Sequence, residues 1–213
     1  MKIIRRKTVL KTTLLASLAL VFSQSAFAGD DKAKKAKPEL LMGASTSMIG
    51  NTCAGCHGSN GVSKGPSIPT LAGMPSAYIV ETMEGYKSGD IPSTIMGRLA
   101  KGYTSEEFAQ MGDYFSKLKF VAATGQKVDD AKAEEGAKLH EKYCEKCHSE
   151  SGTVADDDSG FLKGQLKSYL AAQMMDYQNK DRKAPKKMKK KIKKLHKKHG
   201  PAGIEALIEY YAK

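Results

Sequence analysis

Six residues of this chain have types and spacing suited to chemistry, and they form two groups with one pattern, C-x-x-C-H. The groups use all four cysteines of the 213-residue chain and are Cys53, Cys56 and His57, then Cys144, Cys147 and His148. Two thiols three positions apart can form thioethers with the vinyl groups of a porphyrin, and the adjacent imidazole then becomes an axial ligand of the iron. The sequence therefore predicts two covalently bound haem c groups.

Two other uses of the cysteines have to be weighed against haem attachment. The four thiols could form a closed tetrahedral zinc site, but zinc would leave His57 and His148 unexplained. A thioredoxin-like redox site needs a βαβ context, and no alternating apolar run flanks either motif. Haem attachment accounts for more of the pattern than either alternative.

The two motifs belong to an internal repeat. An offset of 91 residues relates Cys53 to Cys144, and further residue types recur at the same offset. They are His57 and His148, Gly73 and Gly164, Tyr78 and Tyr169, Met83 and Met174, Tyr86 and Tyr177, and Asp90 and Asp181. Such coincidence indicates duplication of one module, in two copies rather than a solenoid array.

The repeat also suggests the second axial ligand of each iron. Met96 follows His57 by 39 residues and Met188 follows His148 by 40, so the two correspond with one inserted residue. A thioether is a soft neutral ligand, and His/Met ligation raises the reduction potential. The alternative is that either methionine packs in a core, as most methionines do.

Other candidate ligands are weaker. Met74, Met83 and Met111 compete with Met96, but Met83 and Met111 lie on apolar helical stripes and are expected in the core. His140, His196 and His199 are expected to be solvated side chains. The carbonyl of Pro66 could accept the Nδ1 proton of His57 and so orient the ring, or Pro66 could be an ordinary turn residue.

The N-terminus has the form of a secretory signal peptide, residues 1–28. A basic start is followed by a nine-residue apolar run and by Ala26-Phe27-Ala28. That run is far shorter than the ~20 residues of a spanning helix, so an uncleaved anchor is the weaker alternative. We expect a periplasmic protein with no stable membrane insertion after cleavage. Losing five basic residues of the leader lowers the formal charge from +12 to +7.

The remaining chain divides into two helical modules. Residues 29–39 are charged and lack apolar periodicity, which indicates a mobile arm. We expect cytochrome c domain 1 at 40–123, a polar linker at 124–130 and domain 2 at 131–213. Expected helices cover 40–52 and 76–88, begin after the capping-box pattern at Thr104, and cover 131–143. The predicted fold class is all-α.

A dense basic run lies near the second methionine. Eleven lysines and arginines and no acidic residue occur between Arg182 and Lys198. Met188, Ile192 and Leu195 share one helical face, so the basic side chains should occupy the outer faces until Gly200-Pro201 stops the helix. The run could be a solvated face, a docking surface for an acidic redox partner, or a site for anionic lipid. Nucleic acid is not expected, because no aromatic residue interleaves the run.

Longer motifs carry a family resemblance. They are Met-Glu-Gly-Tyr-Lys-Ser-Gly-Asp at 83–90, Ser-Thr-Ile-Met-Gly-Arg-Leu-Ala-Lys-Gly-Tyr at 93–103, and Lys-Leu-His-Glu-Lys-Tyr-Cys-Glu-Lys-Cys-His at 138–148. With the first C-x-x-C-H motif, the chain resembles dihaem class I cytochromes c of the cytochrome c4 group, and more closely the cytochrome subunit of flavocytochrome c sulfide dehydrogenase. The lysine density at 186–198 is higher than expected of that family.

The resemblance implies two tandem class I domains related by pseudo-twofold symmetry, with Met96 and Met188 as axial ligands. It also implies an FAD-containing flavoprotein partner that oxidises sulfide, and a small soluble acceptor for the electrons. On this interpretation the chain transfers electrons and does no substrate chemistry itself. The alternative is a free-standing dihaem carrier of the cytochrome c4 kind, which would share every ligand and differ in its partner surface.

Overall fold

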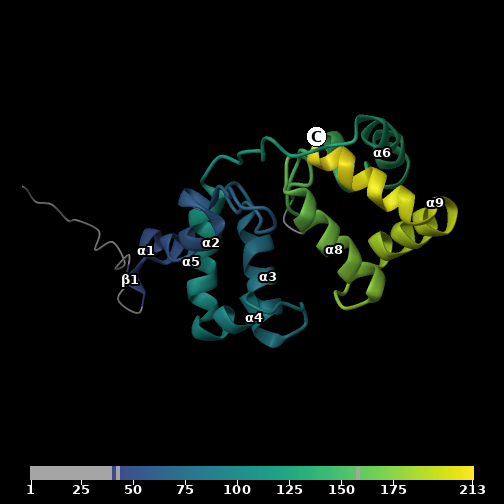
Figure 1. Cartoon of the computed structure of the whole chain (residues 1–213). Coiled ribbons are helices and arrows are strands. Elements are labelled where there is room, and N and C mark those ends of the chain that lie inside the picture. Colours follow the sequence, from purple (N-terminus) through teal and green to yellow (C-terminus); the bar gives the residue numbers. More distant parts are fainter. Residues whose placement is uncertain (1–39, 42–43, 157–158) are drawn as a thin grey trace, which may run out of the picture. The chain divides into compact units, whose positions relative to one another are not determined.

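The computed structural model describes residues 40–41, 44–156 and 159–213 (Figure 1). The expected signal peptide and charged arm lie outside the described residues. The described residues form one compact unit. The fold is helical, as predicted, and its only described strands are the short antiparallel pair β1 (Leu40–Leu41) and β2 (Ala44–Ser45). The expected helix from Leu40 is therefore wrong at its start, because that stretch pairs as a hairpin before α1 (Thr46–Asn51) begins.

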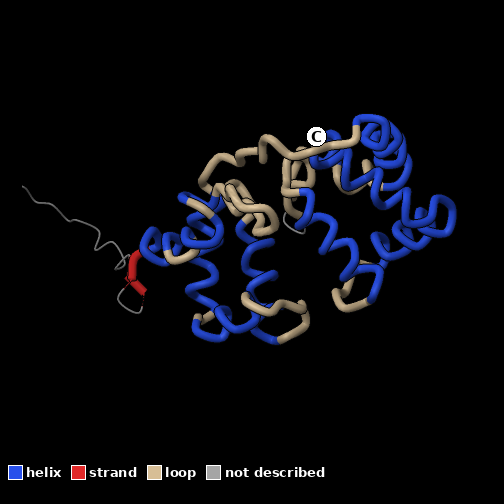
Figure 2. Tube along the Cα trace, in the orientation of Figure 1, coloured by secondary structure: helices blue, strands red, loops and turns tan. Residues whose placement is uncertain are grey.

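Helices occupy two successive stretches of the chain, coloured blue in Figure 2. The N-terminal half continues with α2 (Ala54–His57), η1 (Ser59–Gly61), α3 (Ser76–Ser88), α4 (Met96–Leu99), η2 (Ala100–Gly102) and α5 (Ser105–Ser116). The C-terminal half contains α6 (Asp130–Tyr143), α7 (Ser149–Gly152), α8 (Lys167–Asn179) and α9 (Lys186–Ala212). Within the described residues, no helix combines the length and apolar composition needed to span a bilayer.

Local sequence signals account for the helix ends near the motifs. Thr104 and Glu107 form the predicted capping box of α5, each side chain bonding the other residue's backbone N–H at 3.2 and 2.8 Å. Asp129 caps α6 by accepting from the Lys132 N–H at 3.0 Å. Gly89 ends α3 in the left-handed region with φ 85°. The helices that lead to the functional residues therefore begin and end where short-range chemistry dictates.

Each half has its own hydrophobic core. In the N-terminal half, α5 supplies Phe108, Met111 and Phe115, which pack against Ile79 and Met83 of α3. Met83 and Met111 are 8% and 2% exposed, so the prediction that they are core residues is confirmed. Figure 1 shows α3 and α5 side by side, as their contacts also require.

The second core is built around the crossing of α6 and α9. Leu139 and Tyr143 of α6 pack against Leu207 and Tyr211 of α9. The two helices approach closely at Gly136, where an added Cβ would lie only 2.0 Å from the Ala206 carbonyl oxygen. Because α6 leads into Cys144 and α9 carries Met188, this crossing determines where the second motif lies relative to the lysine-rich helix.

The predicted duplication is visible in the backbone. Helices α3 and α8 begin and end at residues separated by 91 positions. In the first half the Leu71 and Ala72 amides both donate to the Gly61 carbonyl, and in the second half the Leu162 and Lys163 amides both donate to the Gly152 carbonyl. These contacts also stand 91 positions apart, so the two halves repeat one fold from their motifs to the helices that follow.

The repeat breaks in the second half at the lysine-rich helix. The Gly73 N–H donates to the Phe115 carbonyl, and its counterpart on Gly164 donates to the Tyr211 carbonyl, so Phe115 and Tyr211 correspond at an offset of 96. The extra residues therefore lie between Asp181 and Tyr211. Gly200, with φ 63° and ψ −161°, interrupts α9 as predicted, and helix resumes at Pro201.

Loop residues 117–129 join the halves (Figure 2). The predicted linker is non-helical up to Asp129, and Gln126 within it bonds the carbonyls of Gln165 and Ala212 at 3.1 and 3.2 Å. The fully buried Gln165 side chain in turn accepts from the Thr70 N–H at 3.0 Å and donates to the Thr70 carbonyl at 3.1 Å. These hydrogen bonds favour the contact between Gln165 and Thr70, because breaking them would leave buried polar groups without hydrogen-bond partners.

Candidate haem-binding sites

The first motif forms a single helical turn. The amides of Cys56 and His57 donate to the Cys53 carbonyl at 3.2 and 2.9 Å. Residues three and four positions apart in a helical turn lie on one face, so both sulfurs and the imidazole are presented together. Cys53 is half-buried against the first core and Cys56 is exposed. Burial raises the pKa of the Cys53 thiol.

His57 is held by a backbone carbonyl, but not by the one expected. Its Nδ1 lies 2.8 Å from the Pro69 carbonyl oxygen and must carry the proton, because a carbonyl only accepts. Of the two alternatives for Pro66, the one in which its carbonyl orients His57 is therefore wrong. The loop brings Pro69 to the ring, and the Pro66 carbonyl accepts from the Ser168 hydroxyl. The hydrogen bond from Nδ1 leaves Nε2 as the nitrogen with a lone pair, which is the form that binds a metal.

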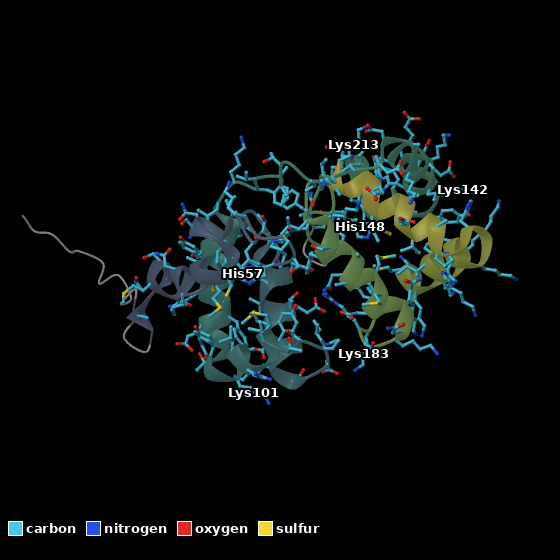
Figure 3. All side chains as sticks on the ribbon, viewed as in Figure 1. His57, Lys101, Lys142, His148, Lys183 and Lys213 are labelled. Carbon is cyan, nitrogen blue, oxygen red and sulfur yellow. The ribbon has the colours of Figure 1, made fainter. Side chains whose placement is uncertain are left out.

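Burial supports a neutral imidazole at His57. His57, labelled in Figure 3, is buried, with 7% of the residue exposed. This burial lowers the pKa of the imidazole, while the hydrogen bond to Pro69 opposes that effect. A neutral ring is the species required of an axial ligand.

The second motif repeats the same turn. The amides of Cys147 and His148 both donate to the Cys144 carbonyl at 3.0 Å. Cys144 is half-buried against the second core, and Cys147 is exposed. Burial raises the pKa of Cys144, and a hydrogen bond with the Tyr211 side chain acts in the opposite direction. His148 is half-buried on the second helical group (Figure 3).

The two candidate methionine ligands differ in their surroundings. Met96 begins α4, where its N–H donates to Ser93 Oγ at 2.9 Å, and its half-buried side chain packs against the same core as Cys53. Met188 lies half-buried in the first turn of α9 and is not among the side chains packed on the second core. The structure thus brings Met96 and Cys53 to one core, whereas it leaves Met188 at the margin of the other. The ligand assignment remains a prediction for both.

The prediction that His140 is solvated is wrong. Its side chain is buried, 2% exposed, and contacts Tyr211 and Glu145. The signal was present in the sequence, because His140 shares one helical face with the small or apolar Gly136 and Tyr143. His196 is exposed, as expected, while His199 is half-buried with its Nε2 3.3 Å from the Tyr143 hydroxyl.

The basic run mostly follows prediction. All nine lysines from 186 to 198 are exposed, and Lys183, labelled in Figure 3, pairs with Asp90 at 2.6 Å. Arg182, at the start of the run, is buried instead. It is 8% exposed, its guanidinium lies 5.3 Å from the Tyr177 ring centroid, and it donates to Gln173.

The donor sets fit haem better than zinc. Cys53 packs on the first core and Cys144 on the second, so the thiols are divided between the two halves. Among the described residues no three His, Cys, Asp or Glu side chains gather closely enough to hold a metal ion. Each half instead offers two thiols and one imidazole on a single turn, the set that covalent haem attachment requires.

Two such turns on duplicated helical halves define a c-type cytochrome with two covalently attached haem groups. The family model for cytochrome c matches residues 44–119. The chain is 36% identical over 105 residues to the cytochrome subunit of sulfide dehydrogenase from Chlorobaculum tepidum. This alignment covers 49% of this chain and 94% of that protein. It is 30% identical over 174 residues to cytochrome c4 from Pseudomonas aeruginosa, covering 77% of this chain and 80% of that one.

The chain belongs to the cytochrome c family, with relatives among cytochromes c4 and the cytochrome subunits of sulfide dehydrogenase. Its fold agrees with that of reduced recombinant cytochrome c4 from Pseudomonas stutzeri, with a TM-score of 0.65 and 24% identity over 79% of this chain and 98% of that one. Covalently bound haem c is the cofactor of this family, and the activity is electron transfer.

Proposed function

We propose that this chain is the cytochrome subunit of a periplasmic sulfide-oxidising flavocytochrome. An FAD-containing subunit would supply electrons, and the two haems of this chain would pass them to a small soluble acceptor. The observation that carries the proposal is the 36% identity to the cytochrome subunit of sulfide dehydrogenase along 94% of that relative. The resemblance of the segments at 83–90 and 93–103 to the same group supports it.

The residue assignments are part of the proposal. Cys53 and Cys56 would hold the first haem, and Cys144 and Cys147 the second, each through two thioethers. His57 and His148 would be the first axial ligands, with Met96 and Met188 opposite them. Domain 1 would occupy 40–123 and domain 2 residues 131–213, because each stretch contains its own core.

The chain's own residues would orient and protect the bound groups. Bound haem supplies reversible one-electron chemistry at iron. The Pro69 carbonyl keeps the His57 ring in one tautomer and orientation, so its Nε2 points away from that hydrogen bond. Met96 would bind from its place against the first core, in which Phe108 is fully buried.

The test is purification from the native periplasm with haem and flavin spectra recorded on the same chromatographic peak. We expect a flavoprotein to copurify, and sulfide to reduce the haems of the complex but not those of the separated cytochrome. Full occupancy of both haems in a protein that purifies alone would contradict the flavocytochrome role.

That last outcome would support the second candidate, a free-standing periplasmic dihaem carrier. The 30% identity to cytochrome c4 along 80% of its length favours this alternative. The exposed lysines of α9 also suit a carrier that meets an acidic partner by electrostatic attraction.

A separate test addresses the ligands. Replacing Met188 by Ala should remove the methionine-to-iron charge-transfer absorption of one haem and leave that of the other. Met175→Ala is the matched control, because that side chain is 55% exposed and should affect neither. Retention of both absorptions in Met188→Ala would refute the assignment.

A further inference from the structure

Three polar side chains meet beside the second cysteine motif. His140 of α6 is 2% exposed, and its Nδ1 lies 2.7 Å from the hydroxyl of Tyr211 on α9. Its Nε2 contacts the carboxylate of Glu145, which lies between the two cysteines of the motif. Tyr211 also belongs to the core against which the Cys144 side chain packs. Polar contacts thus join a partly exposed carboxylate within the motif to a buried imidazole and a tyrosine hydroxyl.

The first half has no such chain at the equivalent positions. Ile49 corresponds to His140, and Ala54 to Glu145, at the offset of 91. Phe115 corresponds to Tyr211, because both carbonyls accept from equivalent glycine amides. Ile49 and Phe115 are 3% and 1% exposed, so apolar packing suffices to build this part of the fold. A buried polar network in the same place carries a desolvation cost that packing alone does not explain.

Glu145 also supports the segment that follows His148. Its two carboxylate oxygens accept from the amides of Glu150 at 2.9 Å and Ser151 at 3.2 Å. Both of those residues are non-glycine residues with positive φ, 50° and 65°. Because left-handed backbone is unfavourable for such residues, the two hydrogen bonds help to hold the turn. Glu145 therefore connects His140 with the backbone on the other side of the motif.

The charged and titratable groups around His140 are few. From α9 the rings of Tyr210 and Tyr211 lie 5.4 Å from the imidazole centroid. The Lys163 ammonium lies 4.0 Å from the Tyr210 ring centroid, and the charge of Lys191 lowers the pKa of Cys144. Among the described residues, Glu145 is the only carboxylate paired with His140.

The two partners of His140 have defined protonation states at neutral pH. Burial raises the pKa of Tyr211 well above its ordinary value, so its hydroxyl stays protonated. The hydrogen bond from His140 lowers the pKa of Glu145, which stays ionised. His140 therefore lies between a protonated hydroxyl and an ionised carboxylate.

We propose that His140, Glu145 and Tyr211 are positioning residues of the second haem site, and that they couple its reduction potential to pH while the first haem remains insensitive. The proposal rests on the assignment of Cys144 and Cys147 as the second attachment site. When one electron leaves that haem for a one-electron acceptor, His140 releases one proton through Glu145 to water. When an electron returns, His140 takes up one proton.

The physical basis is charge compensation in a medium of low dielectric constant. Loss of an electron adds one positive charge at the haem, and a buried imidazolium nearby would be repelled by it. Proton release removes that repulsion. Glu145, 39% exposed in its side chain, connects the buried ring to solvent.

The experiment is a spectroelectrochemical titration of both haems in the purified full-length holoprotein from pH 5 to 9. In the wild type we expect one potential to fall as pH rises, towards the limit of one proton per electron, ~59 mV per unit, while the other stays flat. His140→Gln retains a hydrogen-bonding side chain without a titrating ring, and should flatten the sloping potential. His196→Gln is the matched control, because that histidine is exposed on α9.

Two further variants keep the test decisive if His140→Gln does not fold. Tyr211→Phe introduces the ring found at Phe115 and should reduce the slope by removing the hydroxyl that contacts His140 Nδ1. Glu145→Gln should shift the sloping potential upwards, because it removes a negative charge. Equal pH dependence of both haems, or a slope retained in His140→Gln and Tyr211→Phe, would overturn the proposal. Neither flavin copurification nor sulfide activity enters this measurement, so its result stands apart from the flavocytochrome proposal.

Discussion

The crossing of α6 and α9 can be tested with a single methyl group at Gly136. In an open helix, Gly→Ala is stabilising by about 1 kcal/mol, because alanine has the higher helix propensity. At Gly136 the new Cβ would lie 2.0 Å from the Ala206 carbonyl oxygen and 2.7 Å from Tyr210 Cβ. The first neighbour is backbone, so it cannot rotate away. Restoring an ordinary contact requires the helices to separate by more than 1 Å.

That separation would loosen the packing of Leu139 on Leu207 in the second core. Overpacking of this kind costs about 1–3 kcal/mol, and the rigid neighbour favours the upper end. After subtracting the propensity gain we expect a net destabilisation of about 2 kcal/mol. For a domain of 60–100 residues each kcal/mol lowers Tm by about 4–8 °C, so the expected loss is about 8–16 °C.

The assay is thermal unfolding of the holoprotein followed by circular dichroism and by haem absorbance. Gly102→Ala is the control, because a Cβ there meets nothing within 4 Å and should change Tm little. If Gly136→Ala melts at or above the wild-type temperature, the close crossing of α6 and α9 is not as described, and the positioning of the second motif by α9 loses its support.

Three further predictions concern caps, core and charge. Thr104→Ala should destabilise the first half by about 1 kcal/mol through loss of the α5 capping box, whereas Thr104→Ser should not; urea unfolding measures both. Phe108→Ala should cost about 3–5 kcal/mol in the same assay, since the ring is 0% exposed, and a smaller loss than Thr104→Ala would contradict that burial. The pKa of the Glu145 carboxyl is lowered in the native state, so its ionisation stabilises the fold above the ordinary pKa of 4.5, and this stabilisation is lost as pH falls through the native pKa. Glu145→Gln should therefore weaken the dependence of stability on acidic pH. An unchanged acid profile of stability would argue against the His140 contact.

Much of the fold followed from local patterns. The α3 boundaries, the α5 capping box and the break at Gly200 were predictable because each depends on neighbouring residues. The duplication was predictable because equal offsets preserve equal backbone contacts, down to the paired amides on Gly61 and Gly152. The hairpin at Leu40–Leu41 was not predictable, since short apolar stretches suit either helix or strand.

The hydrogen-bond acceptor of His57 Nδ1 and the burial of His140 could not be predicted from neighbouring residues in the sequence. Pro66 and Pro69 lie in one loop with similar composition, and only the path of that loop decides which carbonyl reaches the ring. His140 reads as a polar residue in a charged helix. It is buried because the last turns of α9 cover that face of α6 and bring Tyr211 to it.

The sequence by itself determined that this chain attaches two haem groups and is a duplicated module, because attachment needs two thiols and an imidazole within one helical turn. Tertiary structure alone decided how the two sites differ. The first is lined at Ile49 and Phe115 by apolar groups, and the second holds His140, Tyr211 and Glu145 in contact. Such contacts join residues up to 71 positions apart, so they depend on how α9 packs on α6 rather than on any local spacing.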